Sequence, residues 1–308
     1  MSRGPVVVLA GGTGGARLAR GMLDLAGPDL VVVANTADDI EAYGAAVSPD
    51  PDLVAFTLAD IIDARGWGID GDTFTEMERR RAAGEDAWFN LGDRDLGWCR
   101  RRSELLAEGL TPTEAMAQLT ASLGLEARVL PMSDRPVRTR VKAAGRTRGL
   151  QEFLILDRGE GPIEGIEFEG IEAALPTREV LEAVSQARAI VIGPSNPVIS
   201  IGPILALDGM AGALRSCAAP VVAVSPFVGG KVLKGPTAAC LEAWGLEPTA
   251  AGAARAWADV ADLLVSDEPV PGSPVPVRVA PTLMDTPTHR EAVARAALEA
   301  AEALSVGP

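Results

Sequence analysis

The chain is poor in the residues that most often act as nucleophiles, general bases and soft metal ligands. It has one histidine, His289, and three cysteines that lie far apart and form no CxxC pair. This pattern argues against a thiolate metal site and favours free, buried or half-buried thiols. His289 lies in a Pro-Thr-His-Arg segment typical of a helix start, so we expect it at the surface. Aromatic residues make up only 4% of the chain, so the core must be built from Ala, Val, Leu and Ile.

Positive charge and long apolar runs are also scarce. The chain has 28 Lys and Arg against 42 Asp and Glu, a net charge of −14. Such a surface repels nucleic-acid backbones and anionic lipid, so we expect neither a nucleic-acid nor a membrane partner. No apolar run approaches the roughly 20 residues of a membrane span, and the run at 6–10 is too short for a signal peptide, which predicts a cytoplasmic protein. A small phosphorylated ligand is compatible with this charge, because backbone amides or a metal can hold it locally.

The pattern of apolar segments indicates an α/β fold. The first 35 residues read as a buried strand (6–10), a helix (16–26) and a second buried strand (30–34), which form one βαβ unit with parallel strands. The alternation returns after residue 178. We therefore predict a Rossmann-like fold with a mostly parallel sheet and helices on both faces. The later helices are expected at 178–187, 204–213, 237–244 and 290–304, and the later strands at 189–192, 221–224 and 263–265.

The middle of the chain has a different character. Residues 72–125 are predicted to be mainly helical, and strand candidates follow at 127–130, 137–141 and 151–156. The alternating, partly polar pattern of these strands fits an antiparallel or edge region. The chain has no internal repeat and no clean linker. We therefore expect one domain over residues 1–308, interrupted by a helical insertion at about 72–125.

A glycine-rich segment joins the first strand to the first helix. Glycines at this place let the backbone approach a ligand closely, and the free N–H groups of the helix start attract phosphate. The segment lacks the Gly-Lys-Ser/Thr of a P-loop and fails GxGxxG, because the third glycine would fall on Arg17. A tight turn is the alternative interpretation. As a phosphate loop, the segment should tolerate a side chain at Gly14 with little loss of stability but with loss of ligand binding. Its residues are Gly11, Gly12, Thr13, Gly14 and Gly15.

Four carboxylates follow the second strand within fifteen residues: Asp38, Asp39, Asp50 and Asp52. Open α/β sheets bind ligands at the carboxyl ends of their strands. Mg²⁺ is held in such sites by one or two carboxylates together with phosphate oxygens. The group therefore predicts a hard-cation site beside the glycine segment, and helix capping or turn formation is the alternative for each residue.

Further polar residues follow other strands or form dense turns. Ser195 and Asn196 come after the strand at 189–192, where they could bind a ligand or cap the next helix. Lys231 and Lys234 follow the strand at 221–224, where they could meet phosphate or be merely solvated. The turn at 90–95 reads either as part of a site or as an Asp–Arg network that caps a helix. Because the strand ends converge at one sheet edge, they predict a site for a phosphorylated small molecule, a nucleotide with a divalent metal.

The motifs occur in an order that resembles a known family, the 2-phospho-L-lactate transferases of coenzyme F420 biosynthesis, whose bacterial members are also called phosphoenolpyruvate transferases. Each motif is weak alone, but together they are specific and span nearly the whole chain. They are AGGTGG at 10–15, NTADD at 35–39, SPD at 48–50, RGWG at 65–68, LGDRD at 91–95, LPMSD at 130–134, GPSNP at 193–197 and VSP at 224–226.

The resemblance implies a reaction. A guanosine diphosphate ester of lactate or enolpyruvate would donate its phospho-acid to the ribityl hydroxyl of the deazaflavin Fo, with Mg²⁺ bound and GMP released. The glycine segment would hold the diphosphate, and Ser195 and Asn196 the guanosine. Asp39 and Asp52 would be the catalytic and metal-binding residues, while Asp52 and Asn90 would hold the deazaflavin. A homodimer is the ordinary expectation for such an enzyme.

Two departures and two alternatives accompany this resemblance. The family usually reads Pro-Asp-Leu-Asp-Thr where this chain has Pro-Asp-Pro-Asp-Leu at 49–53. Family members often carry an aromatic residue and a histidine near the position of Glu41, and this chain has only Tyr43 there.

A regulatory nucleotide-sugar-binding protein of the gluconeogenesis-factor type would share the glycine segment and the paired Asp, but not LGDRD. An NAD-dependent oxidoreductase would need GxGxxG and an acid at the position of Asn35.

Overall fold

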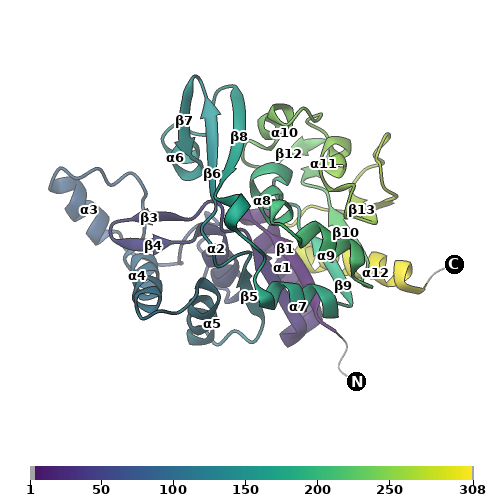
Figure 1. Ribbon diagram of the computed structural model, residues 1–308, viewed down its shortest axis with the longest axis horizontal. Helices are drawn as coiled ribbons and strands as arrows, with labels where there is room; N and C mark the ends of the chain where they lie inside the picture. The colour runs from purple at the N-terminus through teal and green to yellow at the C-terminus, as the bar shows by residue number, and fades with distance from the viewer. Residues whose placement is uncertain (1–3, 307–308) are drawn as a thin grey trace.

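The centre of the molecule is a seven-stranded parallel sheet (Figure 1). The computed structural model describes residues 4–306. The strand order is β14-β13-β10-β9-β1-β2-β5, and every neighbouring pair is parallel. The strands are β1 (Val6–Ala10), β2 (Leu30–Ala34), β5 (Arg128–Pro131), β9 (Ala189–Ile192), β10 (Val221–Val224), β13 (Leu263–Ser266) and β14 (Val277–Val279).

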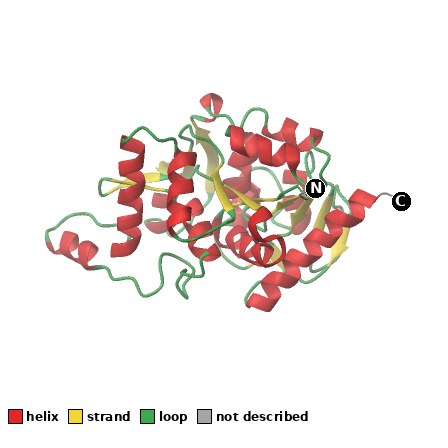
Figure 2. Ribbon diagram, turned by 90° about the horizontal axis from the view of Figure 1, so that it is seen from below, coloured by secondary structure: helices red, strands yellow, loops and turns green. Residues whose placement is uncertain are grey.

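The inner strands are apolar along their whole length because both faces of the sheet are covered. Alternate residues of β1 belong to two separate cores: Val7 and Leu9 pack into one, Val6 and Val8 into the other. Figure 2 shows helices on both sides of the sheet. This arrangement confirms the predicted Rossmann-like α/β fold. One face is covered by α1 (Gly12–Ala26), α2 (Pro49–Leu58) and α12 (Pro287–Val306), the other by α7 (Arg178–Gln186), α9 (Met210–Ser216), α10 (Thr237–Ala243) and α11 (Ala250–Trp257).

The order of the strands fixes where a ligand can bind. From β1 the chain moves outward to β2 and β5, and it later returns to the opposite side of β1 to add β9, β10, β13 and β14. The winding direction therefore reverses between β1 and β9. In open α/β sheets, the crevice at the carboxyl ends of the strands at such a reversal is the usual ligand site.

The middle of the chain is mainly helical, as the sequence predicts. It forms α3 (Thr75–Ala82), α4 (Asp93–Ala107) and α5 (Pro112–Ser122), and α4 packs against a hairpin of β3 (Ile40–Ala42) and β4 (Ala45–Val47). In Figure 1 the hairpin, α3 and α4 extend to one side of the sheet. We propose that the chain is one Rossmann-like domain in which residues 72–125 form an insertion.

Two expectations about secondary structure are wrong. Residues 151–156 form a helix, α6 (Leu150–Ile155), because Leu150 and Phe153 are buried at helical spacing and Glu152 accepts the N–H of Gly149 at the helix start. The strand at 127–130, expected in an antiparallel or edge region, is β5, an edge strand of the parallel sheet. The helix expected at 204–213 is broken at Gly209, whose φ of +85° is left-handed. This region consists of a π-helix (Pro197–Ile201), α8 (Gly202–Ala206) and α9.

Several short elements were not foreseen. An antiparallel sheet in the order β7-β6-β8 stands beside the main sheet, and a small hairpin follows β10. The strand expected at 137–141 is confirmed as the antiparallel strand β6 (Arg138–Ala143). The unforeseen elements are β7 (Arg146–Gly149), β8 (Ile163–Glu169), β11 (Phe227–Val228), β12 (Lys231–Val232), and the 3₁₀ turns Gly27–Asp29 and Ile171–Ala173.

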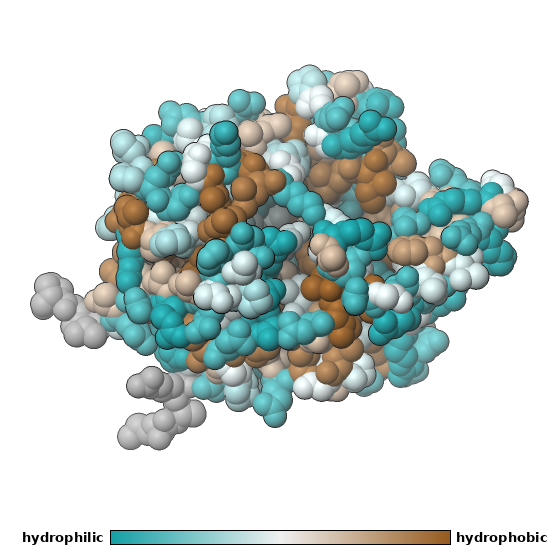
Figure 3. All heavy atoms as spheres, turned by 180° about the vertical axis from the view of Figure 1, so that it is seen from behind, coloured by the Kyte–Doolittle hydropathy of each residue, from teal (hydrophilic) through white to brown (hydrophobic). Residues whose placement is uncertain are grey.

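The surface mixes hydrophilic and hydrophobic side chains, as Figure 3 shows for one face. Within residues 4–306, no single helix is long and apolar enough to cross a membrane. The adjoining segments Pro197–Ala206 and Met210–Ser216 meet the criteria of length and composition only as a pair, with a bend of 83°.

Candidate active site

The glycine segment is the first turn of a helix and not a loop. α1 begins at Gly12, four residues earlier than expected, because the glycines allow α1 to pack closely against the chain after β9. A Cβ atom on Gly14 would lie 2.2 Å from the carbonyl oxygen of Pro194. A Cβ atom on Gly15 would lie 2.8 Å from both Ala10 Cβ and Ser195 Oγ. The glycines therefore have a packing role at the reversal of the sheet, whatever ligand their N–H groups bind.

The expectation that a side chain at Gly14 leaves stability unchanged is therefore wrong. Gly14→Ala should lower the free energy of unfolding by about 1–3 kcal/mol, because the new methyl group must displace backbone atoms of Pro194. Gly97→Ala inside α4 is the matched control, since a Cβ atom there meets nothing within 4 Å and should stabilise the helix by about 0.5–1 kcal/mol. Urea unfolding of both variants checks this, and equal stability of the Gly14 variant and the wild type would contradict it.

Asp50 occupies part of the N-terminus of α1. Its Oδ1 accepts the N–H of Gly12 at 2.6 Å, and its Oδ2 accepts Nδ2 of Asn35 at 2.9 Å. Burial raises the pKa of Asp50 to about 6. Asp50 and Asp52 do not lie in a loop, as their spacing suggested, but in the first turn of α2, where the prolines of the segment are tolerated. One N–H of the α1 terminus is thus already bonded to a carboxylate, and the following N–H groups of its first turn have no partner within the helix.

Asp38 and Asp39 form the acidic end of β2. Asp38 is buried, its Oδ2 accepts Nε2 of Gln151 at 2.8 Å, and its Oδ1 has no hydrogen-bond partner among residues 4–306. Asp39 is half-buried and accepts the hydroxyl of Ser48 at 2.7 Å. Burial raises the pKa of Asp39 to about 7, and burial together with the charges of Asp50 and Asp39 raises the pKa of Asp38 well above its usual range. Neither carboxyl forms a salt bridge within residues 4–306, although the charges of Arg138 and Arg102 act on Asp39 and partly oppose the effect of burial.

Asp52 is paired with a buried arginine. Nη1 of Arg102 donates to Asp52 Oδ2 at 3.0 Å and Nη2 donates to Oδ1, while Nε1 of Trp98 donates to Oδ1 at 2.7 Å. Both side chains of the ion pair are buried. Before Asp52 could bind a cation, as the sequence suggested, this pair would have to open.

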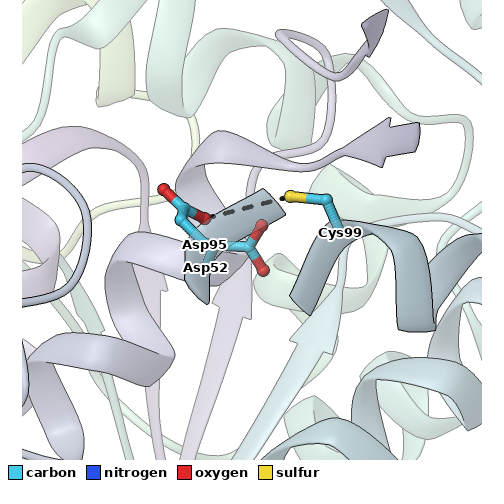
Figure 4. A group of neighbouring side chains, drawn as sticks. All are labelled: Asp52, Asp95 and Cys99. Atoms are coloured by element: carbon cyan, nitrogen blue, oxygen red, sulfur yellow. Dashed lines mark hydrogen bonds between the residues drawn. The ribbon is translucent and has the colours of Figure 1, made fainter. Parts of the chain in front are cut away.

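Asp52 also lies in a group with Asp95 and Cys99, shown in Figure 4. One ligand atom from each of the three lies within 4.8 Å of the others. Burial and the charge of Asp52 raise the pKa of Asp95 to about 7, and burial raises the pKa of the Cys99 thiol well above its usual range. A protonated thiol is a poor ligand for Mg²⁺, and Arg102 already balances Asp52, so this group does not fit a magnesium ion.

A magnesium ion fits the end of β2 better. The donors there are carboxylate oxygens, which Mg²⁺ prefers, and the unpartnered Oδ1 of buried Asp38 has a lone pair to offer. Since no trio formed by Asp38, Asp39 and Asp50 comes within 4.8 Å in the described part of the chain, one or two of these carboxylates would act together with phosphate oxygens.

The turn at 90–95 acts as a set of helix caps. Asp93 accepts the N–H groups of Thr75 and Glu76 at the start of α3, and Asp72 accepts those of Arg94 and Asp95 at the start of α4. Capping therefore occurs here, but not as the sequence suggested: Asp93 of LGDRD caps α3, and the cap of α4 comes from Asp72 outside the motif.

Two side chains expected near the deazaflavin are engaged elsewhere. Asn90 is exposed and its Oδ1 accepts Nη2 of Arg81 at 2.6 Å, and no hydrogen bond joins it to Asp52 within residues 4–306. Tyr43 accepts the N–H of Phe89 with its hydroxyl, and its ring is covered by Arg80 at 5.0 Å. That ring is therefore not free on the Arg80 side for stacking.

Residues after β9 and β10 also have structural partners. Asn196 Oδ1 accepts the N–H groups of Val198 and Ile199, so it caps the π-helix, while its buried Nδ2 has no partner in the described chain. Ser195 Oγ lies 3.4 Å from the N–H of Gly11. Lys234 Nζ stands 4.0 Å from the ring centroid of the exposed Trp67. Capping accounts for Asn196 Oδ1, and the same side chain also lies against the buried thiol of Cys240.

A cleft of about 140 Å³ opens beside Asp39, at the carboxyl ends of β2 and β5. Its walls come from the β3–β4 hairpin, the start of α2, α4, the start of α5 and the start of β6. Its lining combines polar groups with apolar side chains that include Val47, Leu106 and Met116. The polar lining includes Thr36, Asp39, Ser48, Arg102, Ser133 and Arg138.

Two of these lining residues, Arg102 and Arg138, are absent from the sequence-based prediction. Arg102 lies in a run of three arginines that resembles a solvated helix face. Its spacing from Leu96, Cys99 and Leu105 nevertheless places it on the buried stripe of α4, and that spacing could have identified it. For Arg138 no such local signal exists, because its place depends on how β6 packs.

Other proteins resemble this chain over most of its length. Residues 6–299 match the family model described as 2-phospho-L-lactate transferase CofD. A 2-phospho-L-lactate transferase of Methanosarcina mazei is 38% identical over 265 residues, covering 85% of this chain and 87% of the relative. A phosphoenolpyruvate transferase of Streptomyces griseus is 38% identical over 313 residues, covering 96% and 98%. A crystal structure of a UPF0052 family protein from Bacillus halodurans is 19% identical with a TM-score of 0.60, covering 91% of this chain and 88% of that one, and shows the fold alone.

Proposed function

Since the chain belongs to the 2-phospho-L-lactate transferase family, we propose that it transfers a phospho-lactyl or phospho-enolpyruvyl group from a guanosine diphosphate ester to the ribityl hydroxyl of the deazaflavin Fo. The products would be GMP and the first phosphodiester form of coenzyme F420. The observation that carries this proposal is the cleft beside Asp39, which brings together unpartnered polar groups within a chain matched to this family over residues 6–299.

The order of the strands supports an order for the parts of the donor. Asn196 follows β9, the glycine segment follows β1, Asp38 and Asp39 follow β2, and the cleft lies between the ends of β2 and β5. These strands are consecutive in the sheet. A donor laid along this edge would have its guanosine near Asn196, its diphosphate at the start of α1, and its transferred group near Asp39 and the cleft.

The residues at the end of β2 suit a magnesium ion, and we propose Asp39 together with Asp38 as its ligands. When bound there, Mg²⁺ would offset the charge of the diphosphate in a protein of net charge −14. Ser48 holds Asp39 in place through its hydrogen bond. Asp52 acts through Arg102, which it fixes in the cleft wall.

The reaction needs no protein nucleophile. The acceptor hydroxyl oxygen would form a bond to the phosphorus that carries the acid, the bond from that phosphorus to the bridging oxygen of GMP would break, and the hydroxyl proton would be lost. Phosphoryl transfer depends mainly on positioning and on stabilising charge. This suits a site built from backbone N–H groups, carboxylates and arginines, and a chain with one exposed histidine.

Mass spectrometry of products tests the proposal. The protein is incubated with Fo and the guanosine diphosphate esters of lactate and enolpyruvate, each with Mg²⁺ or with EDTA. We expect the phosphodiester and GMP from at least one ester with Mg²⁺, and neither product in EDTA. Absence of product from both esters, together with binding of a nucleotide sugar and not of Fo, would instead favour a regulatory protein of the gluconeogenesis-factor type.

A further inference from the structure

We propose that Arg138 binds the carboxylate of the three-carbon acid carried by the donor, in the cleft beside Asp39. This inference rests on the transferase function proposed above and assigns to one residue the recognition of the transferred acid. Three observations support it: Arg138 forms no salt bridge in the described chain, a hydroxyl in the same cleft has no partner, and the cleft is small.

Arg138 lines the cleft without an acidic partner. Its only side-chain hydrogen bond within residues 4–306 goes from Nη1 to the carbonyl oxygen of Val137, at 2.8 Å. Glu169 lies directly opposite Arg138 in the pairing of β6 with β8, but its carboxylate pairs instead with Arg140 at 2.6 Å. Within the described chain, no carboxylate lies within 4.0 Å of the Arg138 guanidinium. In a chain with an excess of 14 acidic residues, an arginine left free at the wall of a cleft indicates an anionic ligand.

Of the other charged side chains around Asp39 that line the cleft, Arg102 and Asp134 have partners, whereas Glu41 and Arg135 are exposed. Arg102 is held by Asp52, and Asp134 accepts both the N–H and the hydroxyl of Thr113. Arg135 also lines the cleft but is exposed, whereas Arg138 is half-buried and close enough for its charge to act on Asp39. Arg138 is therefore the cation best placed beside the carboxylates that we assign to the magnesium ion.

A second polar group in the cleft lacks a partner. Thr36 is 5% exposed and lines the cleft, and its Oγ1 has no hydrogen-bond partner among the described residues. Buried polar atoms are normally hydrogen-bonded, so this unpartnered hydroxyl on a residue that lines the cleft is a candidate donor to a ligand. A carboxylate can accept hydrogen bonds from a guanidinium and a hydroxyl together.

The dimensions of the cleft suit a small acid. Its volume of about 140 Å³ is well below the roughly 300–1,000 Å³ of pockets that enclose drug-sized ligands, so it holds a three-carbon acid more readily than a tricyclic ring. The apolar wall formed by Val47, Leu106 and Met116 would contact the methyl or methylene carbon of the acid. With its carboxylate on Arg138, the acid would fix the orientation of the phosphorus to which it is attached.

Binding of three ligands to Arg138→Met tests the assignment, with calorimetry as the measurement. The first ligand is GDP, which carries no acid, and the second is the guanosine diphosphate ester of lactate. The third is the matching ester of 2-propanol, in which a methyl group replaces the carboxylate. We expect the variant to bind GDP and the 2-propanol ester like the wild type and to bind the lactate ester roughly tenfold or more weakly, since a hydrogen-bonded charge is lost. Arg138→Lys keeps the positive charge but loses the two parallel donors of the guanidinium, so its affinity for the lactate ester should lie between those of the wild type and Arg138→Met.

Lys142→Met is the matched control, because Lys142 lies four residues away on the same strand and is paired with Glu164 outside the cleft, so Glu169 stays bound to Arg140. It should change none of the three affinities. An equal loss of affinity for all three ligands in Arg138→Met would make Arg138 a phosphate contact and overturn the proposal, as would unchanged binding of the lactate ester. The binding test does not depend on turnover, so a wild type that makes the product while Arg138→Met keeps its lactate-ester affinity would overturn only this inference. A wild type that makes no product but loses lactate-ester binding in Arg138→Met would overturn only the proposed function.

Discussion

Replacing Arg102 with methionine is expected to lower the free energy of unfolding by about 3–5 kcal/mol, because it leaves the carboxylate of Asp52 buried without its partner. The same substitution should lower turnover strongly, since Arg102 also forms part of the cleft wall beside Asp39. Chemical denaturation measures the first effect, and product formation in the fraction that remains folded measures the second.

The double variant Asp52→Asn/Arg102→Met separates the ion pair from packing. Breaking a buried pair by removing one member costs more than removing both charges, so the double variant should recover much of the stability lost by Arg102→Met. Arg101→Met is the control, because Arg101 is exposed and pairs with Glu104 at the surface, where the loss should stay below about 1 kcal/mol. Equal stability of Arg102→Met and Arg101→Met would contradict the expected cost of leaving the Asp52 carboxylate buried without a partner.

The parallel sheet could be predicted from the sequence because its evidence is local. The runs at 6–10, 30–34, 189–192 and 221–224 are wholly apolar and bounded by turns, which is the pattern of strands buried on both faces. The antiparallel region was harder to predict, because β8 is half-exposed and its residues give no clear period. For α6, the strand-like composition of 151–156 competed with a helix start at Gly149, and the packing of Leu150 and Phe153 decided for the helix.

The candidate site likewise has one part that the sequence predicts and another part that it does not. Residues at the strand ends, such as Asp39 and Asn196, follow from the rule that parallel strands place their carboxyl ends at one edge. Which of them are free to bind a ligand does not follow from that rule. The partner of Asp52 comes from α4, and the freedom of Arg138 depends on Glu169 in β8, a strand that the pattern does not predict. Contacts between distant segments decide these roles.

Replacing Asp39 with asparagine should abolish most activity while leaving the protein more stable at neutral pH. Asparagine keeps an oxygen to accept the hydroxyl of Ser48 but removes the charge that we assign to the metal. Loss of one preorganised charged group typically costs about 3 kcal/mol of transition-state stabilisation, or a hundredfold or more in turnover. Product formation over a range of Mg²⁺ concentrations measures this effect. Asp60→Asn, which alters an exposed partner of Arg20, is the control and should keep full activity.

In the metal-free protein, the charge of Asp39 is expected to lower the stability of the fold, although the same charge is needed for activity. The pKa of Asp39 is raised from 3.8 to about 7 in the folded state, so between these values the folded protein holds a proton that the unfolded chain has lost. The free energy of unfolding therefore falls as pH rises from about 4 to about 7 and levels off above, by up to about 4 kcal/mol from this group, less what solvent screens at its open side. In EDTA, the stability of Asp39→Asn should match that of the wild type below about pH 4 and exceed it at pH 8, where Mg²⁺ should in turn stabilise the wild type more than the variant. If Asp39→Asn were less stable than the wild type at pH 8 in EDTA, the charge of Asp39 would stabilise the metal-free fold. That result would contradict its assignment as a metal ligand whose charge destabilises the fold when no metal is bound.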